Sequence, residues 1–192
     1  MENKIYWALR DEILYNYEQE NNLIQFVYTA VIAALGLAIT MQISWLAFVV
    51  SLAIVPMSLR IADIRYSTAY IAAYLKTYLE KPTDKYSWEN MHYAFSEKHS
   101  GKSLKNFIYN ACRMDFGILV GICSIIFWAI HGIELIGESY AITILVVGLQ
   151  VFIVLFESYI GVKFANLRIL KKDLILKWGE LEKDLEKEET KK

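Results

Sequence analysis

The sequence is poor in the residues that break, cross-link or bend a chain. Among its 192 residues there are only two prolines and nine glycines, which excludes disordered and collagen-like proteins. The two cysteines, Cys112 and Cys123, stand apart and show neither a disulfide framework nor the spacing of a zinc site. We therefore interpret both of them as buried apolar thiols.

Motifs that carry catalysis or bind a metal are also missing. There is no glycine-rich phosphate loop, no nucleophile elbow and no paired-histidine zinc motif. The three histidines, His92, His99 and His131, have no second pair of ligands near them in the sequence. The sequence thus predicts no enzyme activity, no metal and no cofactor. Its net charge of −1 and the lack of a strongly basic block argue against binding to double-stranded nucleic acid.

Positive charge is absent from two long stretches of the chain. All 20 lysines and arginines lie within 4–10, 60–113 and 163–192, and none lies within 11–59 or 114–162. These two gaps hold most of the aliphatic residues of a chain that is 56% hydrophobic. A soluble fold has no reason to separate charge in this way, because its polar surface runs along the whole chain. The pattern indicates an integral membrane protein.

Each gap is long enough for two membrane spans. A bilayer core of about 30 Å requires about 20 helical residues, and the chain carries no charged side chain from Leu23 to Leu59. A polar break divides each gap, so the predicted spans are 23–40, 45–60, 116–133 and 139–162. The predicted fold class is therefore all-α, an integral membrane protein with four transmembrane helices arranged as two hairpins.

The distribution of lysine and arginine also predicts the topology. The turns expected at 41–44 and 132–138 contain neither residue, whereas cytoplasmic loops are enriched in both. We therefore expect both turns outside and both termini in the cytoplasm, with the protein in the bacterial inner membrane. Aromatic residues typical of membrane interfaces mark the span ends, namely Trp45, Trp128, Tyr140 and Tyr159.

Amphipathic helices are expected outside the spans. The predicted organisation is an N-terminal cytoplasmic helix over 1–22, a hairpin over 23–60, a cytoplasmic helical segment over 61–115, a hairpin over 116–162 and a C-terminal cytoplasmic helix over 163–192. In the last of these, Leu167, Leu174 and Leu181 recur every seven residues and form a seam with Trp178. The seam predicts packing either on the helix that follows the second span or on other copies of the chain.

Polar residues inside the predicted spans are candidates for function. Thr143, Gln150 and Glu157 recur every seven residues, so they form one stripe along the fourth span. An acidic group in mid-membrane costs roughly 2.5–3.5 kcal/mol. The stripe therefore predicts either the lining of a pore or interhelical hydrogen bonds in the interior of a packed bundle. Secondary candidates, for which we favour packing, are Gln25, Thr29, Ser51 and Ser58.

The aromatic middle segment is a candidate recognition surface. Trp88 and His92 lie close to the basic residues Lys98 and Lys102, a combination that suits stacking on a base beside a phosphate. A nucleotide-type signal or a cytosolic regulatory protein is the partner that this composition suggests. Packing against the other cytoplasmic helices is the alternative.

Two segments resemble known membrane proteins. LRDEILYNYEQENNLIQF before the first span and LRIADIRYSTAYIAAYLKTYLE after the second, together with the span layout, resemble small bacterial multi-span proteins such as the anti-phage membrane effectors of the Hailong type. The resemblance implies an oligomeric channel that depolarises the inner membrane when a nucleotide-type signal changes. It assigns no role to any individual residue.

Two functions follow from these observations. The first is an oligomeric channel, or a membrane-permeabilising effector, gated by its cytoplasmic helices in bacterial anti-phage defence. A narrow pore lined by four spans per chain requires several copies, so a symmetric homo-oligomer is expected. The alternative is a non-conducting scaffold in the lipid bilayer that binds a cytosolic partner through its helical tail.

Overall fold

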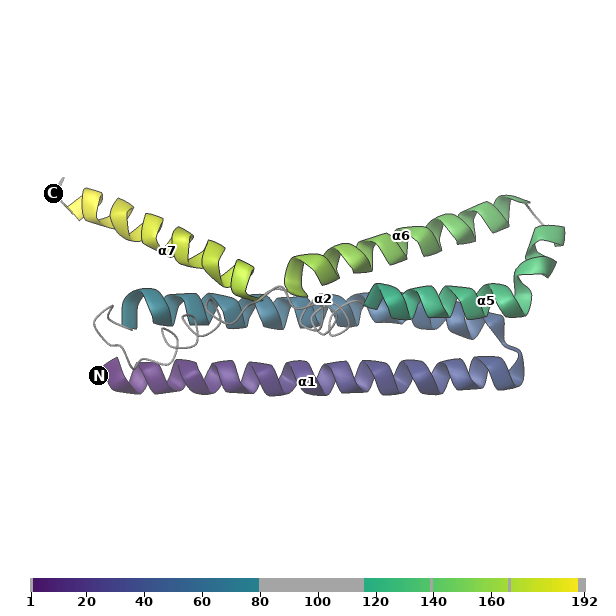
Figure 1. The fold of residues 1–192 in the computed structure, drawn as a ribbon, viewed down its shortest axis with the longest axis horizontal. Coiled ribbons are helices and arrows are strands. Elements are labelled where there is room, and N and C mark those ends of the chain that lie inside the picture. Colours follow the sequence, from purple (N-terminus) through teal and green to yellow (C-terminus); the bar gives the residue numbers. More distant parts are fainter. Residues whose placement is uncertain (1, 80–115, 139, 166, 190–192) are drawn as a thin grey trace, which may run out of the picture. The chain divides into compact units, whose positions relative to one another are not determined.

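The computed structural model describes residues 2–79, 116–138, 140–165 and 167–189, and these ranges are all-helical apart from the turn at Gln42 and Ile43. Figure 1 shows the elements in order, which are α1 (Glu2–Met41), α2 (Ser44–Tyr74), the π-helical segment η1 (Leu75–Leu79), α5 (Phe116–Glu138), α6 (Tyr140–Ala165) and α7 (Leu167–Glu189). The all-α prediction is confirmed for the described residues.

Three helices within these ranges are long and apolar enough to cross a membrane. They comprise Lys4–Met41, Ser44–Leu79 and Tyr140–Phe164. In α5 the corresponding apolar stretch, Phe116–Ile130, is shorter. The three long apolar helices support a membrane location, which agrees with the charge gaps in the sequence.

The chain forms two compact units. One, called here the span unit, contains residues 21–62 and 109–165, and the other, called the charged unit, contains residues 1–20, 63–108 and 166–192. The helix α1 continues through Asn21 without interruption, as α2 continues through Asp63. The expected N-terminal helix over 1–22 and the first span are therefore one helix, because no proline or glycine separates them.

The first hairpin turn lies where it was predicted and ends α1 in a Schellman motif. Gln42 has a positive φ of 56°. The backbone N–H of Ile43 donates to the carbonyl of Ala38 at 3.0 Å, and that of Gln42 donates to Ile39 at 3.4 Å. These two bonds are the 6→1 and 5→2 pair that satisfies the last carbonyls of a helix.

The second turn differs from the prediction. We expected a break over 132–138, but α5 continues to Glu138 and α6 begins at Tyr140. Two glycines, Gly132 and Gly137, and two acidic residues lower helix propensity without the steric block that proline imposes. The polar composition of this segment was therefore insufficient to end the helix.

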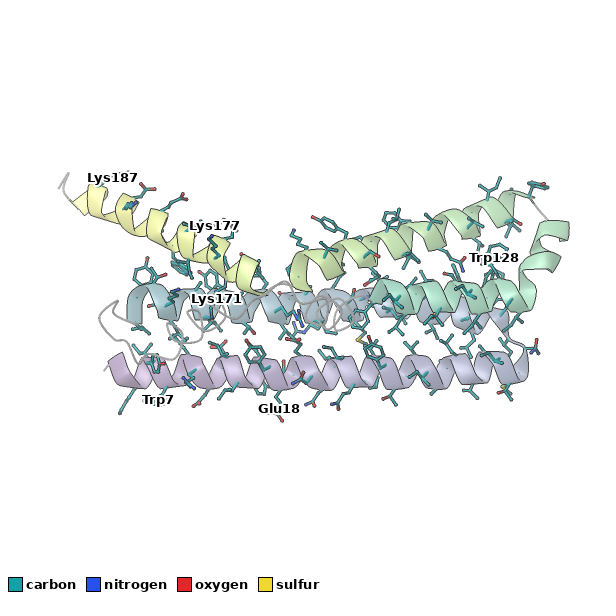
Figure 2. The ribbon with its side chains drawn as sticks, viewed as in Figure 1. Trp7, Glu18, Trp128, Lys171, Lys177 and Lys187 are labelled. Carbon is teal, nitrogen blue, oxygen red and sulfur yellow. The ribbon has the colours of Figure 1, made fainter. Side chains whose placement is uncertain are left out.

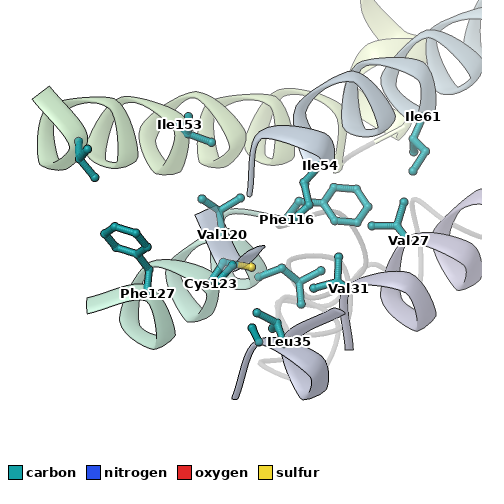
Figure 3. Close-up of a cluster of buried hydrophobic side chains, with 14 residues drawn as sticks. Val27, Val31, Leu35, Ile54, Ile61, Phe116, Val120, Cys123, Phe127 and Ile153 are labelled. Atoms are coloured by element: carbon teal, nitrogen blue, oxygen red, sulfur yellow. The ribbon is translucent and has the colours of Figure 1, made fainter. Parts of the chain in front are cut away.

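The core of the span unit is built from one apolar stripe of each helix. On α1, Val27, Val31 and Leu35 recur at spacings of four and are buried. They belong to one cluster with buried residues of the other helices, which Figure 3 shows as Ile54 and Ile61 of α2, Phe116, Val120, Cys123 and Phe127 of α5, and Ile153 of α6. Large residues such as Ile125 and Leu155 are exposed on the outside, as expected of surfaces that contact lipid.

In the charged unit, α2 packs on α1 through one face and on α7 through another. Ile13 of α1 lies in a cluster with Ile71 and Leu75, whereas Leu174 of α7 is buried with Ala69 and Ala73. Leu174 and Trp178 of the predicted seam therefore pack on the continuation of the second span, whereas Leu181 is exposed.

Candidate functional site

Glu157 is buried in the interior of the span unit. It lies on α6 with no exposed surface, and its Oε1 accepts a hydrogen bond of 2.8 Å from Ser58 Oγ of α2. The Ser58 hydroxyl also lies 2.9 Å from the carbonyl oxygen of Val55, so its one hydrogen has two acceptors. A carboxyl group is thus held between two apolar helices by a neutral donor.

Gln150, two turns earlier on α6, is held by a tryptophan of α5. The indole N–H of Trp128 donates to Gln150 Oε1 at 2.6 Å, and only 4% of Gln150 is exposed. Among the described residues, Gln150 Nε2 has no hydrogen-bond partner. Trp128, labelled in Figure 2, also stays a predicted marker of a membrane interface, and its indole N–H donates to the buried Gln150.

A row of serines on α2 matches the polar stripe of α6. Ser44, Ser51 and Ser58 recur every seven residues and are all buried. Since α2 and α6 run in the same direction in Figure 1, the contact between Ser58 and Glu157 sets their register. A step of seven residues along both helices then brings Ser51 to the level of Gln150, and a second step brings Ser44 to the level of Thr143. We call Ser51, Ser58, Trp128, Gln150 and Glu157 the polar seam.

The secondary candidates on α1 do not join the polar seam. Gln25 and Thr29 are exposed, and Thr29 Oγ1 donates to the carbonyl oxygen of Gln25 at 2.8 Å. A threonine that bonds to its own helix in this way needs no neighbour to satisfy it. Gln25 and Thr29 thus face the outside of this chain, whereas Ser51 and Ser58 are buried within it.

The candidates for contact with a signal lie outside the described residues. Trp88, His92, Lys98 and Lys102 all fall within 80–115. Their assignment stays a prediction from the sequence.

A buried ion pair in the charged unit was not predicted from the sequence. Arg65 of α2 donates from Nε and Nη2 to Glu20 Oε1 of α1, at 3.0 and 2.7 Å. Only 2% of Arg65 and 1% of Glu20 are exposed. The sequence did contain a signal for this pair, because Arg65 lies on the same helical face of α2 as Ile61 and Thr68.

A tryptophan of α7 is surrounded by tyrosines of α2 and η1. The ring centroids of Tyr70, Tyr74 and Tyr78 lie 5.0, 5.4 and 5.6 Å from that of Trp178. The Tyr78 hydroxyl donates to the backbone carbonyl of Trp178 at 3.3 Å. Such aromatic pairs contribute about 0.5–1.5 kcal/mol beyond their buried area, so this cluster holds α7 against α2 and η1.

The exposed face of α7 carries short-range ion pairs. Lys177 Nζ lies 2.8 Å from Asp173 Oδ2, and this hydrogen bond, together with the negative charge of Asp173, raises the pKa of Lys177. Both side chains are exposed, so solvent screens the interaction and it adds little to stability.

Neither a metal centre nor a relative identifies the site. Among the described residues there is no group of three or more His, Cys, Asp or Glu side chains that could hold a metal ion. Comparison with protein-family models, with curated proteins and with solved structures yields no match. The polar seam is therefore interpreted from its own chemistry.

Proposed function

We propose that the chain is an oligomeric membrane channel, or a membrane-permeabilising protein, whose charged unit gates a polar path through the span unit. In this proposal α5 is a fourth span, both termini lie in the cytoplasm and the membrane is the bacterial inner membrane. The observation that carries the proposal is the burial of Glu157, with Gln150 and the serines of α2 at successive levels.

The energetics of the bilayer favour a functional role for Glu157. A carboxyl group inside a membrane is costly, and such residues commonly mark ion and proton paths. Within the apolar bundle, the neutral hydroxyl of Ser58 donates to Glu157 Oε1 at 2.8 Å. We therefore favour a role in conduction as the reason for an acidic residue at position 157.

The helices provide a mechanical connection for gating. Because α1 and α2 pass from one unit to the other without interruption, a movement of their ends in the charged unit also moves the spans. In the charged unit, Glu20 and Arg65 join α1 to α2, and Trp178 joins α7 to α2. A signal that disturbs either contact would change the packing around the polar seam. For a defence effector, a nucleotide-type molecule or a cytosolic protein would supply that signal.

The alternative is a non-conducting scaffold that binds a partner through α7. Interhelical hydrogen bonds such as Ser58–Glu157 also stabilise membrane bundles that conduct nothing. The surface of α7 favours this role in one respect, because it presents many exposed charged groups to the solvent, Lys177 and Asp173 among them. The two functions differ in whether Glu157 affects conductance.

The membrane potential of bacteria that express the protein distinguishes them. A voltage-sensitive dye would be read for the wild type and for the Glu157→Gln and Glu157→Ala variants. Ser158→Ala is the matched control, because it removes a neighbouring polar group of α6 that lies outside the seam. We expect depolarisation by the wild type and the control, and its loss in Glu157→Ala.

The result for the wild type decides between the functions. If both Glu157 variants depolarise the membrane as strongly as the wild type, the polar seam is not the conduction path. A wild type that leaves the potential unchanged, even after Trp178→Ala releases α7, would favour the scaffold. Equal membrane levels of all variants on an immunoblot are required for either conclusion.

A further inference from the structure

The outward face of α1 in the charged unit is apolar although it has no lipid to contact. Trp7, Leu14 and Tyr15 are exposed by 57%, 56% and 59%. They lie on the side of α1 opposite to Ile13 and Glu20, which pack against α2. Asp11 and Glu18 share this outward face, because residues 7, 11, 14, 15 and 18 lie within about 100° of one another around the helix axis. Figure 2 shows Glu18 on the side of α1 away from α2.

The length of α1 keeps this face out of the membrane. The apolar part of the helix ends at Leu23, and Leu14 and Trp7 lie nine and sixteen residues before it. At about 1.5 Å per residue, these distances are about 13 and 24 Å along a continuous helix. The headgroup layer extends only about 5–8 Å beyond the hydrocarbon core. Exposed apolar residues at that height are suited to contact with a protein partner.

The outward face of α7 is complementary to it. Lys172, Leu176 and Lys183 are exposed and lie on the side of α7 opposite to Leu174 and Trp178. Leu176 is 61% exposed. One face thus offers apolar residues with two carboxylates, and the other offers an apolar residue between two ammonium groups.

The two faces also match in register. α1 runs antiparallel to α2, as the pairing of Glu20 with Arg65 and of Ile13 with Ile71 requires, and Figure 1 shows α7 running in the direction of α2. Antiparallel helices align residues whose numbers have a constant sum. A sum of 190 pairs Glu18 with Lys172, Leu14 with Leu176, and Trp7 with Lys183, which are an ion pair, an apolar contact and a cation–π contact.

We infer that the outward face of α1 binds the outward face of α7 from a second copy of this chain. Within one copy the two faces point away from each other, because α2 lies between α1 and α7. The contact is therefore head-to-tail, and repeated contacts of this kind close into a ring when the rotation permits. The inference rests on the proposed function, for which it supplies the interface between protomers.

Disulfide trapping between copies tests the interface. Two chains with different epitope tags would be co-expressed in a background with Cys112→Ser and Cys123→Ala. One chain carries Leu14→Cys and the other carries Leu176→Cys, and membranes are oxidised with copper phenanthroline. A disulfide dimer that contains both tags is expected. The matched control replaces Leu14→Cys by Tyr17→Cys, which is 37% exposed on a different side of α1 and should give little of this dimer.

Charge reversal supplies the second test. Glu18→Lys or Lys172→Glu should each reduce the trapped dimer by about 1.5- to 5-fold, the range expected for one exposed ion pair. The two changes together should restore it. Both side chains are exposed, so the fold of each chain is retained.

The outcomes separate the interface from the channel. Trapping that is equal for Tyr17→Cys, trapping only between two Leu14→Cys chains, or no trapping would each overturn the proposed interface. Trapping with restoration by the double reversal, in cells that keep their membrane potential, would support the interface and count against conduction. Depolarisation without trapping would support conduction and count against the interface.

Discussion

At the scale of single residues, the chain buries two acidic side chains in different ways. Glu20 accepts two hydrogen bonds from the charged guanidinium of Arg65, whereas Glu157 accepts a hydrogen bond from the neutral hydroxyl of Ser58. A buried charge that meets its counter-ion is stabilised by it, while removal of one partner leaves the other uncompensated. The two carboxyl groups should therefore respond differently to substitution.

Arg65→Met should destabilise the protein by about 3–5 kcal/mol, because it leaves the carboxylate of Glu20 buried without its guanidinium. Thermal unfolding of the detergent-solubilised protein would measure the loss. The double variant Glu20→Leu/Arg65→Met should recover most of it, since neither charge remains. Arg60→Met, at an exposed position of α2, is the control. A single variant as stable as this control would contradict the prediction.

The turn after α1 gives a second prediction at this scale. Gln42 has φ of 56°, a left-handed conformation that costs a residue with a Cβ roughly 1–2 kcal/mol and glycine nothing. Gln42→Val should therefore be less stable than Gln42→Gly by about 1–2 kcal/mol. The wild type should lie between them, because its Nε2 donates to the carbonyl oxygen of Ile39 at 2.9 Å. Equal unfolding temperatures for the two variants would contradict this order.

At the scale of elements, α7 depends on one aromatic side chain. Its exposed face is charged, and its buried contacts are few, with Leu174 and Trp178 as the largest. A helix held by so few contacts opens locally at a lower cost than the whole fold. Trp178 is therefore the residue that decides whether α7 stays attached to α2.

Trp178→Ala should release α7 at a cost of about 2 kcal/mol, less than the roughly 3–5 kcal/mol of a fully buried tryptophan. Trypsin should then cleave at Lys171 and Lys177 at least about tenfold faster than in the wild type. Leu181→Ala is the control, because Leu181 is 46% exposed and its removal should leave the cleavage rate unchanged. An equal increase in both variants would argue against a specific role of the cluster.

The elements were predictable where hydrophobic periodicity and charge decide them. The absence of lysine and arginine located the long apolar helices, and the spacing of seven located Gln150 and Glu157 on one face. The residues that meet this face, Ser58 and Trp128, come from other helices and are fixed by tertiary packing. The end of α5 was missed because local polarity was taken for a turn in a segment that lacks proline.

At the scale of the whole molecule, the proposed topology has two hairpins that open toward the cytoplasm. We expect Gln42→Cys, in a chain without Cys112 and Cys123, to react with a membrane-impermeant maleimide on intact spheroplasts. Lys187→Cys, which is exposed on α7, should react only after the membrane is permeabilised. The opposite labelling pattern would invert the topology, and labelling of both sites would place the two positions on the same side.

The two-unit organisation of the molecule follows in part from the sequence. The unit boundaries near residues 20, 62 and 165 lie close to the positions where the sequence changes between charged and apolar composition. The joining of the N-terminal helix and the first predicted span into the single helix α1 was not predicted, whereas the continuation of the second span beyond residue 60 was. Composition changes at Leu23 and Leu59, but helix geometry does not depend on which solvent surrounds it.

The shortness of the turn between α1 and α2 limits where a ligand can bind to the protein. Gln42 and Ile43 are all that separates α1 from α2, which leaves too little chain at that end of the hairpin to enclose a ligand. In the proposed topology, an antibody, toxin or nutrient arriving from outside the cell would find no receptor there. A signal would therefore have to act on the protein at some place other than this turn.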